Sequence, residues 1–142
     1  MLPRARRRKQ LPPMDHTQAF LRYVEARRGS VSEVSVEAAQ DALAENPAAM
    51  LVDVREDKEF DAAHAAGAIH VGRGVIERDI ETLIPDVNRP LYLYCGGGFR
   101  SILAAASLQE MGYTNVHSVA GGWRGWQAAG APIESNNATE NP

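Results

Sequence analysis

Short apolar runs alternate with longer amphipathic segments along most of the chain. The runs MLVDV (50–54) and PLYLY (90–94) are almost unbroken and rich in branched or aromatic side chains. Such runs are typical of strands that are buried on both faces of a parallel sheet. Shorter apolar runs predict further strands within residues 32–36, 68–71 and 115–122.

Helical spacing of apolar residues appears on either side of these runs. In DHTQAFLRYVEARRG the residues Phe20, Leu21 and Val24 share one face, with Asp15 or Thr17 as a candidate cap and Gly29 as a stop signal. A second helix follows the first predicted strand, with four apolar residues on one face, and ends at Asn46-Pro47. The sequence therefore predicts two helices before the first long apolar run.

Further helices are predicted between and after the later strands. KEFDAAHAAG predicts one or two helical turns, SILAAASLQEMGY a helix that stops at Gly112, and WRGWQAAG a short closing helix. Trp123 and Trp126 in the closing helix are expected to pack against the sheet. In GVIERDIETLI we expect five side chains to face inward: Val75, Ile76, Ile80, Leu83 and Ile84.

Strands that alternate with helices predict an α/β fold. We expect one parallel β-sheet of about five strands, flanked by helices on both faces and joined by right-handed crossovers. A chain of 142 residues has the size of one domain, which we place at residues 15–133, including the N-terminal helix. Residues 1–14 form a basic tail and residues 134–142 a polar tail, and both are predicted to be disordered.

The charge is divided unevenly along the chain. Residues 1–9 hold five of the 15 basic side chains and no acidic ones, which leaves ten Lys and Arg against 18 Asp and Glu in the remainder, a balance of −8. The folded part is therefore expected to repel nucleic acid. The arginine run would bind RNA or an acidic membrane surface if it does not remain a disordered tail.

No membrane or secretory segment stands out. No apolar run approaches the ~18 residues that are needed to cross a membrane. The basic residues at the start lead into QLPPMDHTQ rather than into the apolar region of a signal peptide. We therefore expect a cytoplasmic protein without a membrane partner.

The only cysteine, Cys95, stands in the stretch YCGGGFRS. A single cysteine cannot form an internal disulfide, and without a histidine cluster it cannot make a structural zinc site. The stretch also lacks the lysine and the spacing of a phosphate-binding loop. We therefore expect no metal, nucleotide or flavin cofactor, and Cys95 is either a small buried hydrophobe or a working thiol.

The surroundings of Cys95 favour the working thiol. The predicted strand 90–94 delivers it to the carboxyl edge of the sheet, where ligands of α/β proteins bind. A helix that begins near Arg100 would point its positive end at the sulfur. The three glycines between permit positive φ and allow successive N–H groups to aim at one point. We therefore predict that the loop stabilises an anionic, strongly nucleophilic sulfur.

Three motifs together resemble the single-domain rhodaneses, a sulfurtransferase family. These are C-x4-R-S after a buried strand, LVDVRE two elements earlier, and GGW after the last strand, and the resemblance covers roughly residues 34–133. In that family the loop cysteine takes a sulfane sulfur from a donor, becomes a persulfide and passes the sulfur to a thiophilic acceptor. The resemblance implies that Cys95 is the nucleophile and persulfide carrier. It also implies that the persulfide is cradled by Gly96, Gly97, Gly98, Phe99, Arg100 and Ser101.

The resemblance also implies supporting residues. Asp53 and Arg55 of LVDVRE would be polar supports beneath the loop, with a solvent-facing ion pair as the alternative for Arg55. EFDAAHAAGAIHVGRG corresponds to a family segment that usually reads F-x-x-G-H-I-P-G-A, although alanines replace the first Gly and the Ile-Pro. His64 is expected to cap or brace this turn rather than transfer protons. Arg73 would attract an anionic donor at the pocket rim, or is a plain surface arginine.

The predicted activity is sulfur transfer without a cofactor. A sulfane sulfur would move from thiosulfate or a low-molecular-weight persulfide, through a Cys95 persulfide, to cyanide or a thiol, and a protein persulfide is a further candidate partner. The alternatives are a non-catalytic rhodanese-like binding or scaffold module and, less favoured, a cysteine phosphatase or arsenate reductase. Such phosphatases place five residues between Cys and Arg, whereas four separate Cys95 from Arg100 here.

Overall fold

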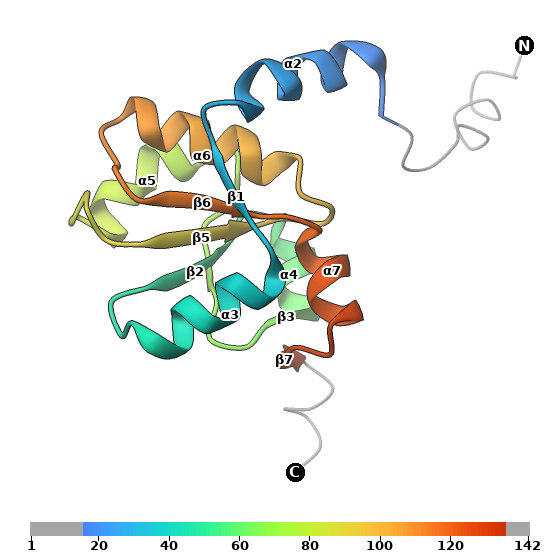
Figure 1. The fold of residues 1–142 in the computed structure, drawn as a ribbon, viewed down its shortest axis with the longest axis vertical. Helices are drawn as coiled ribbons and strands as arrows, with labels where there is room; N and C mark the ends of the chain where they lie inside the picture. The colour runs from blue at the N-terminus through green and yellow to red at the C-terminus, as the bar shows by residue number, and fades with distance from the viewer. Residues whose placement is uncertain (1–15, 136–142) are drawn as a thin grey trace, which may run out of the picture.

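A five-stranded parallel sheet forms the centre of the molecule (Figure 1). The computed structural model describes residues 16–135. The strands follow the spatial order β1-β6-β5-β2-β4, and β2 and β5, which derive from the two long apolar runs, have a neighbour on each side. Their bounds are β1 (Ser32–Val34), β2 (Met50–Asp53), β4 (Ile69–His70), β5 (Leu91–Tyr94) and β6 (Val116–Val119). The predicted strands and their parallel arrangement are confirmed.

Helices cover both faces of this sheet, as predicted. They are α2 (Gln18–Arg28), α3 (Val36–Glu45), α4 (Asp57–Ala62), α5 (Ile76–Leu83), α6 (Arg100–Glu110) and α7 (Gly122–Ala128). In Figure 1, α2, α5 and α6 lie above the sheet, and α3 and α7 lie below it. The helix cap of α2 is Thr17, whose side chain accepts a hydrogen bond from Phe20 N at 3.3 Å.

Two separate hydrophobic clusters hold the layers together. Because successive strand residues point to opposite faces, Val52 and Leu93 join the cluster beneath α2, α5 and α6. Their chain neighbours Leu51 and Tyr94 join the cluster against α3 and α7, together with Trp126. The expected packing of the closing helix on the sheet is therefore confirmed for Trp126.

The inward face of α5 is narrower than predicted. Ile76, Ile80 and Ile84 are at most 1% exposed, whereas Val75 is 37% and Leu83 53% exposed. Val75 is the N-cap residue of the helix and Leu83 is its last residue. Both therefore lie at an end of the helix rather than in its middle. The expectation that these two residues face inward is wrong.

A second, two-stranded sheet was not predicted. Strand β3 (Ala63–Ala65) pairs antiparallel with β7 (Ile133–Ser135). The prediction of a disordered tail from residue 134 onward is therefore wrong for Glu134 and Ser135, which are paired strand residues. The remaining residues of the two predicted tails, 1–14 and 136–142, lie outside the described part of the chain.

His64 connects this small sheet to α4. Its Nδ1 lies 2.9 Å from the Phe60 carbonyl oxygen and its Nε2 lies 3.0 Å from Glu134 Oε1. The imidazole also stacks on the Phe60 ring, with centroids 3.7 Å apart. His64 thus joins the turn after α4 to strand β7.

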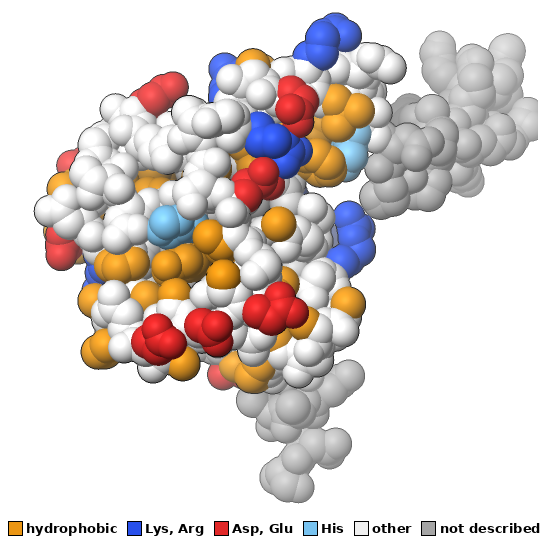
Figure 2. Space-filling view, in the orientation of Figure 1, with side chains coloured by type: hydrophobic (Ala, Val, Ile, Leu, Met, Phe, Trp, Pro, Cys, Tyr) orange, Lys and Arg blue, Asp and Glu red, His pale blue; other side chains and the backbone are white. Residues whose placement is uncertain are grey.

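Acidic side chains line the outer face of α3. Glu37, Asp41 and Glu45 are exposed and follow one another at intervals of four residues, so they share one side of the helix. Figure 2 shows acidic side chains along the lower face of the molecule, where α3 lies in Figure 1.

Among the described residues, no helix is long and apolar enough to span a membrane.

A buried ion pair stands at the end of β2. Asp53 is fully buried and Arg55 is 3% exposed, and Arg55 Nη2 donates to Asp53 Oδ2 at 2.9 Å. The same guanidinium donates to the Ala63 carbonyl at 2.7 Å and lies 4.7 Å from the centre of the Trp123 ring. The alternative of a solvent-facing ion pair for Arg55 is therefore wrong.

Tyr94 extends this network to the strand that carries Cys95. Its hydroxyl donates to Asp53 Oδ2 at 2.5 Å and accepts from Ala65 N at 3.0 Å. Burial, followed by the hydrogen bond to Asp53, raises the pKa of Tyr94 well above its ordinary value, so the phenol remains a donor. Burial by itself would lower the pKa of Arg55, but its contacts with Asp53 outweigh burial and raise it.

Replacing Asp53 with Ala should strongly destabilise the fold. The change leaves the Arg55 guanidinium and the Tyr94 hydroxyl buried without their acceptor, and breaking a buried pair in this way costs about 3–5 kcal/mol. Chemical denaturation would measure the loss in the free energy of unfolding. As a control, Asp79→Ala removes an exposed partner of Arg78 and should leave the midpoint nearly unchanged. An equally small effect of both variants would contradict the structural role of the network.

Candidate active site

Cys95 follows β5 directly and lies at the carboxyl edge of the sheet, as predicted. Cys95 is 1% exposed, yet it contributes to the wall of a pocket of about 400 Å³. The pocket is lined by His16, Phe20, Glu59, Cys95, Gly96, Gly97, Phe99, Arg100 and Arg124. The sulfur is therefore shielded from bulk solvent but lies beside a cavity that can hold a small molecule.

Two backbone N–H groups and one hydroxyl point at the sulfur. Gly98 N lies 3.1 Å and Ser101 N 3.4 Å from Cys95 Sγ, and Ser101 Oγ lies 3.5 Å from it. The Ser101 hydroxyl is held in turn by Ser118 Oγ at 2.8 Å. Because α6 begins at Arg100, the positive end of its dipole also faces the sulfur. Among the loop residues, only the N–H groups of Gly98 and Ser101 lie within hydrogen-bond distance of the sulfur.

The three loop glycines are needed for different reasons. Gly98 alone among them has a positive φ, 105°, so the expectation that Gly97 adopts positive φ is wrong. A Cβ on Gly97 would instead lie 2.5 Å from Arg124 Nη2, and one on Gly96 would lie 3.2 Å from Arg100 Nη2. The absence of side chains at these two positions therefore leaves room for the two guanidinium groups.

The start of α7 holds the loop in place. Trp123 N donates to the Cys95 carbonyl at 2.6 Å, and Arg124 N donates to the Gly96 carbonyl at 3.2 Å. Gly122 has φ 54°, and a Cβ there would collide with the Cys95 carbonyl oxygen. The glycine at position 122 therefore allows the start of α7 to pass close to the cysteine loop.

This docking orients the peptide groups of the loop. In a trans peptide the N–H and C=O point in opposite directions, and the described residues contain no cis peptide. Because α7 binds the carbonyls of Cys95 and Gly96, the N–H groups of Gly96 and Gly97 point away from α7. Within residues 16–135 these two N–H groups make no hydrogen bond.

Arg100 is paired rather than free. Its Nη1 lies 3.2 Å from Glu59 Oε1 of α4. Burial by itself would raise the pKa of Glu59, but the hydrogen bond from Arg100 and one from the Glu56 N–H outweigh burial and lower it. Burial opposes the charge of Arg100 as well, yet Glu59 and the nearby Cys95 raise the pKa of Arg100. The loop arginine thus remains a cation that is held beside the sulfur.

None of the four predicted supporting residues lines this pocket. Arg73 is not among the residues that line it, and its Nη1 pairs with Glu77 Oε2 at 3.1 Å. His64 belongs to the small sheet and does not line the pocket either. Asp53 accepts hydrogen bonds from Arg55 and from the hydroxyl of Tyr94, the residue that precedes Cys95.

Four pocket residues were not predicted from the sequence. They are His16, Phe20, Glu59 and Arg124. His16 and Phe20 belong to the N-terminal helical segment, far from Cys95 along the chain. Arg124 directly follows the GGW motif. Its place next to this motif is the sequence feature that could have identified it as a pocket residue.

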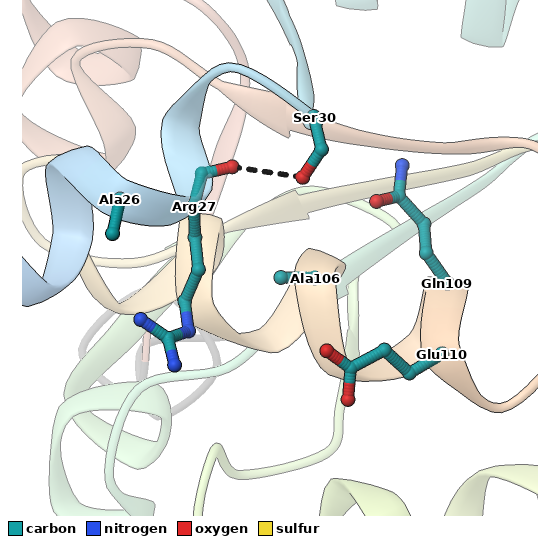
Figure 3. Close-up of a pocket in the computed structure, with 6 residues that line it drawn as sticks. All are labelled: Ala26, Arg27, Ser30, Ala106, Gln109 and Glu110. Atoms are coloured by element: carbon teal, nitrogen blue, oxygen red, sulfur yellow. Dashed lines mark hydrogen bonds between the residues drawn. The ribbon is translucent and has the colours of Figure 1, made fainter.

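A larger cavity, of about 500 Å³, lies between α2 and α6 (Figure 3). Figure 3 shows Arg27 and Glu110 reaching toward the space between the two helices. The ends of the two helices meet at this cavity, where Arg27 of α2 and Glu110 of α6 both line it. Their beginnings meet as well, because His16 before α2 contacts Phe99 before α6. The two helices therefore run in the same direction. The cavity is not lined by the thiol, so the smaller pocket is the candidate active site.

No metal centre accompanies the thiol in the described part of the chain. Among residues 16–135, no group of three or more His, Cys, Asp or Glu side chains is arranged to hold a metal ion. The pocket places the Cys95 thiol next to backbone N–H groups and two arginines.

Relatives with known names share the sequence of this domain. Residues 35–129, more than half of the chain, match the model of the rhodanese-like domain. The thiosulfate sulfurtransferase GlpE of Actinobacillus succinogenes is 38% identical over 104 residues, which cover 73% of this chain and 91% of that protein. GlpE of Vibrio cholerae is 35% identical, over 72% of this chain and 94% of that protein. The putative sulfur carrier protein YrkF of Bacillus subtilis is 32% identical, over 68% and 51%.

Solved structures show the same fold. The polysulfide-sulfur transferase homodimer from Wolinella succinogenes has a TM-score of 0.72 and 28% identity, over 82% of this chain and 87% of that one. A protein of unknown function from Rhodopseudomonas palustris, described as a possible tyrosine phosphatase, has a TM-score of 0.73 and 26% identity, over 87% and 99%. The match to the family model and the identity with the GlpE proteins establish that this chain belongs to the rhodanese-like family.

Proposed function

We propose that this protein is a sulfurtransferase in which Cys95 accepts a sulfane sulfur and carries it as a persulfide. The observation that carries the proposal is the position of the sulfur, which receives two N–H hydrogen bonds and lies at the wall of the pocket. The N–H groups of Gly96 and Gly97, which also line the pocket, have no partner within the described residues. A second, outer sulfur would find hydrogen-bond donors there.

The proposed reaction with thiosulfate balances without a cofactor. The Cys95 thiolate attacks the terminal sulfur of thiosulfate, a new S–S bond forms, and the S–S bond of the donor breaks. Sulfite leaves with the electron pair, and Cys95 retains a persulfide anion. Cyanide then attacks the outer sulfur, so thiocyanate leaves and the thiolate is regenerated. A low-molecular-weight persulfide would react in the same way, with its thiolate as the leaving group.

The paired charges beside Cys95 suit these steps. Arg100 remains cationic next to the thiolate, and the start of α6 stabilises negative charge on the sulfur. Once the thiol is ionised, no general base is needed. The proposed activity therefore does not require His64, which does not line the pocket.

The two rival functions are weaker. A binding module has no need for a cysteine sulfur that receives two N–H hydrogen bonds at the end of a glycine loop. A cysteine phosphatase is the alternative that the description of the Rhodopseudomonas palustris protein suggests for that protein. The loop of this chain has four residues between Cys95 and Arg100, one fewer than a phosphatase loop, which favours a single added sulfur over a tetrahedral phosphate.

Incubation with thiosulfate should add one sulfur atom to the protein. Because Cys95 is the only cysteine in the chain, mass spectrometry of the intact protein would assign the added sulfur to it. Cys95→Ser, a nearly isosteric change, should remove both this mass increase and thiocyanate formation with cyanide. The variant should retain the unfolding midpoint of the parent. Thiocyanate formation by Cys95→Ser at the parent rate would overturn the proposal.

Gly98→Ala should slow sulfur transfer because it strains the loop. An L side chain at a φ of 105° costs about 1–3 kcal/mol, and this strain would displace the N–H that donates to the sulfur. Gly112→Ala is a matched control, since Gly112 has the same φ of 105° but follows the far end of α6. Both variants should lose similar stability, and only Gly98→Ala should lose turnover. Equal turnover in the two variants would contradict the loop geometry as a requirement for activity.

A further inference from the structure

A second hollow lies at the edge of the sheet that is opposite to Cys95. Its volume is about 330 Å³, and its lining includes Ala49 and Met50, where β2 begins. Cys95 instead follows the last residue of the parallel strand β5. Because parallel strands begin at one edge of a sheet and end at the other, the two places are separate. No residue lines both this hollow and the Cys95 pocket.

A smaller hollow, of about 170 Å³, adjoins the first one. Leu43 of α3 and Ala66, which follows β3, line both hollows. Arg89 lines only the larger hollow, and Trp126 and Pro132 line only the smaller one. The two hollows therefore form one groove along α3, with Arg89 at one end and Trp126 at the other. We name this groove the α3 trough.

The lining of the α3 trough is mostly apolar. The side chains of Leu43 and Leu51 line the larger hollow, and Trp126 lines the smaller one. The indole N–H of Trp126 already donates to the Pro132 carbonyl, at 2.7 Å. Arg89 is the only charged residue among those that line either hollow. The trough therefore combines an apolar body with a single positive charge at one end.

Arg89 is held in place but has no anionic partner. Its Nε donates to the Ala48 carbonyl at 2.6 Å, which fixes the guanidinium plane. Within residues 16–135, no carboxylate pairs with this guanidinium and its two terminal nitrogens make no hydrogen bond. A guanidinium that is already oriented loses little side-chain entropy when it binds an anion. Its remaining N–H groups form the planar fork that binds the two oxygens of a carboxylate.

We propose that the α3 trough binds an unbranched aliphatic monocarboxylate of medium length, such as octanoate. The carboxylate pairs with Arg89, and the chain passes Leu43 and Ala66 toward Trp126. A second carboxylate on the ligand would find no cation in the lining. It would also meet the negative field of Glu37, Asp41 and Glu45, which are exposed on the outer side of α3 and line neither hollow. The single arginine and the apolar body thus select a ligand with one charge.

The length of the trough predicts how the affinity depends on the ligand. Each methylene that is removed from water strengthens binding by up to about four-fold. Affinity should therefore rise from butanoate through hexanoate to octanoate, as the chain extends from Arg89 past Leu43 toward the indole ring. Acetate, which has the carboxylate without the chain, should not saturate the protein at the same concentrations.

The first test separates the charge of the ligand from its chain. Isothermal titration calorimetry would measure the dissociation constants of octanoate and of octan-1-ol, which has the chain without the charge. Octanoate should bind the full-length protein about ten-fold more tightly than octan-1-ol, because the carboxylate gains a charge-assisted hydrogen bond from Arg89. Tryptophan emission should change along the same octanoate titration, since Trp126 lines the far end of the trough.

Variants of Arg89 test the position of the carboxylate. Arg89→Gln should weaken octanoate binding about ten-fold and leave the affinity for octan-1-ol unchanged. Arg89→Lys retains the charge but not the planar fork, so it should give an intermediate affinity. It also keeps the test valid if Arg89→Gln disturbs the fold, which thermal unfolding would show. The matched control is Arg78→Gln, which removes an exposed arginine of α5 that lines neither hollow. It should change neither affinity.

Two more variants test the path of the chain and the location of the site. Leu43→Ala should weaken octanoate and octan-1-ol alike, by about three- to ten-fold, because both lose apolar contacts where the two hollows meet. Arg124→Gln removes a cation of the Cys95 pocket. It should leave octanoate binding unchanged if the carboxylate lies on Arg89.

Three results would overturn the proposal. One is that octanoate does not bind the parent protein saturably. Another is that octanoate binds the Arg89 variants, both folded, as tightly as the parent. The third is that Arg124→Gln weakens octanoate binding while Arg89→Gln does not, which would place the ligand beside Cys95. None of these results bears on the proposed sulfur transfer, which is measured separately with thiosulfate.

Discussion

The close approach between the start of α7 and the cysteine loop is the constraint on which the site depends. Hydrogen bonds from Trp123 and Arg124 hold the carbonyls of Cys95 and Gly96, and only a glycine at position 122 permits this contact. A trans peptide that presents its carbonyl to one side must present its N–H to the other. The docking of α7 therefore turns the N–H groups of Gly96 and Gly97 away from the helix.

The same contact places the charges of the site. Because α7 is fixed on the loop, Arg124 of its first turn is held over Gly97, while Arg100 is drawn to Glu59 of α4. One arginine thus stabilises the sulfur within a paired network, and the other remains available to a ligand. Below the loop, the hydrogen bond from Tyr94 to Asp53 joins the carboxyl end of β5 to β2, directly before Cys95.

His16 and Phe20 belong to a part of the pocket that the family segment does not supply. The sheet and its cysteine loop belong to the family segment, which begins at residue 35. The helix α2 packs along α6 from its beginning to its end, and this places Phe20 against Phe99. The pocket beside Cys95 is therefore built partly by residues that precede the family segment.

The sequence by itself determined the order of strands and helices, the parallel sheet and the role of the cysteine loop as the candidate site. Each of these rests on local patterns, namely apolar runs, helical spacing and glycine content. Only the tertiary structure decided that Gly98 adopts positive φ, that Arg73 pairs with Glu77 away from the pocket, and that β3 and β7 pair. It also brought Phe20 and Arg124 to Cys95. These features depend on contacts between residues far apart in the chain, and the strands of the small sheet are too short to produce a periodic pattern of their own.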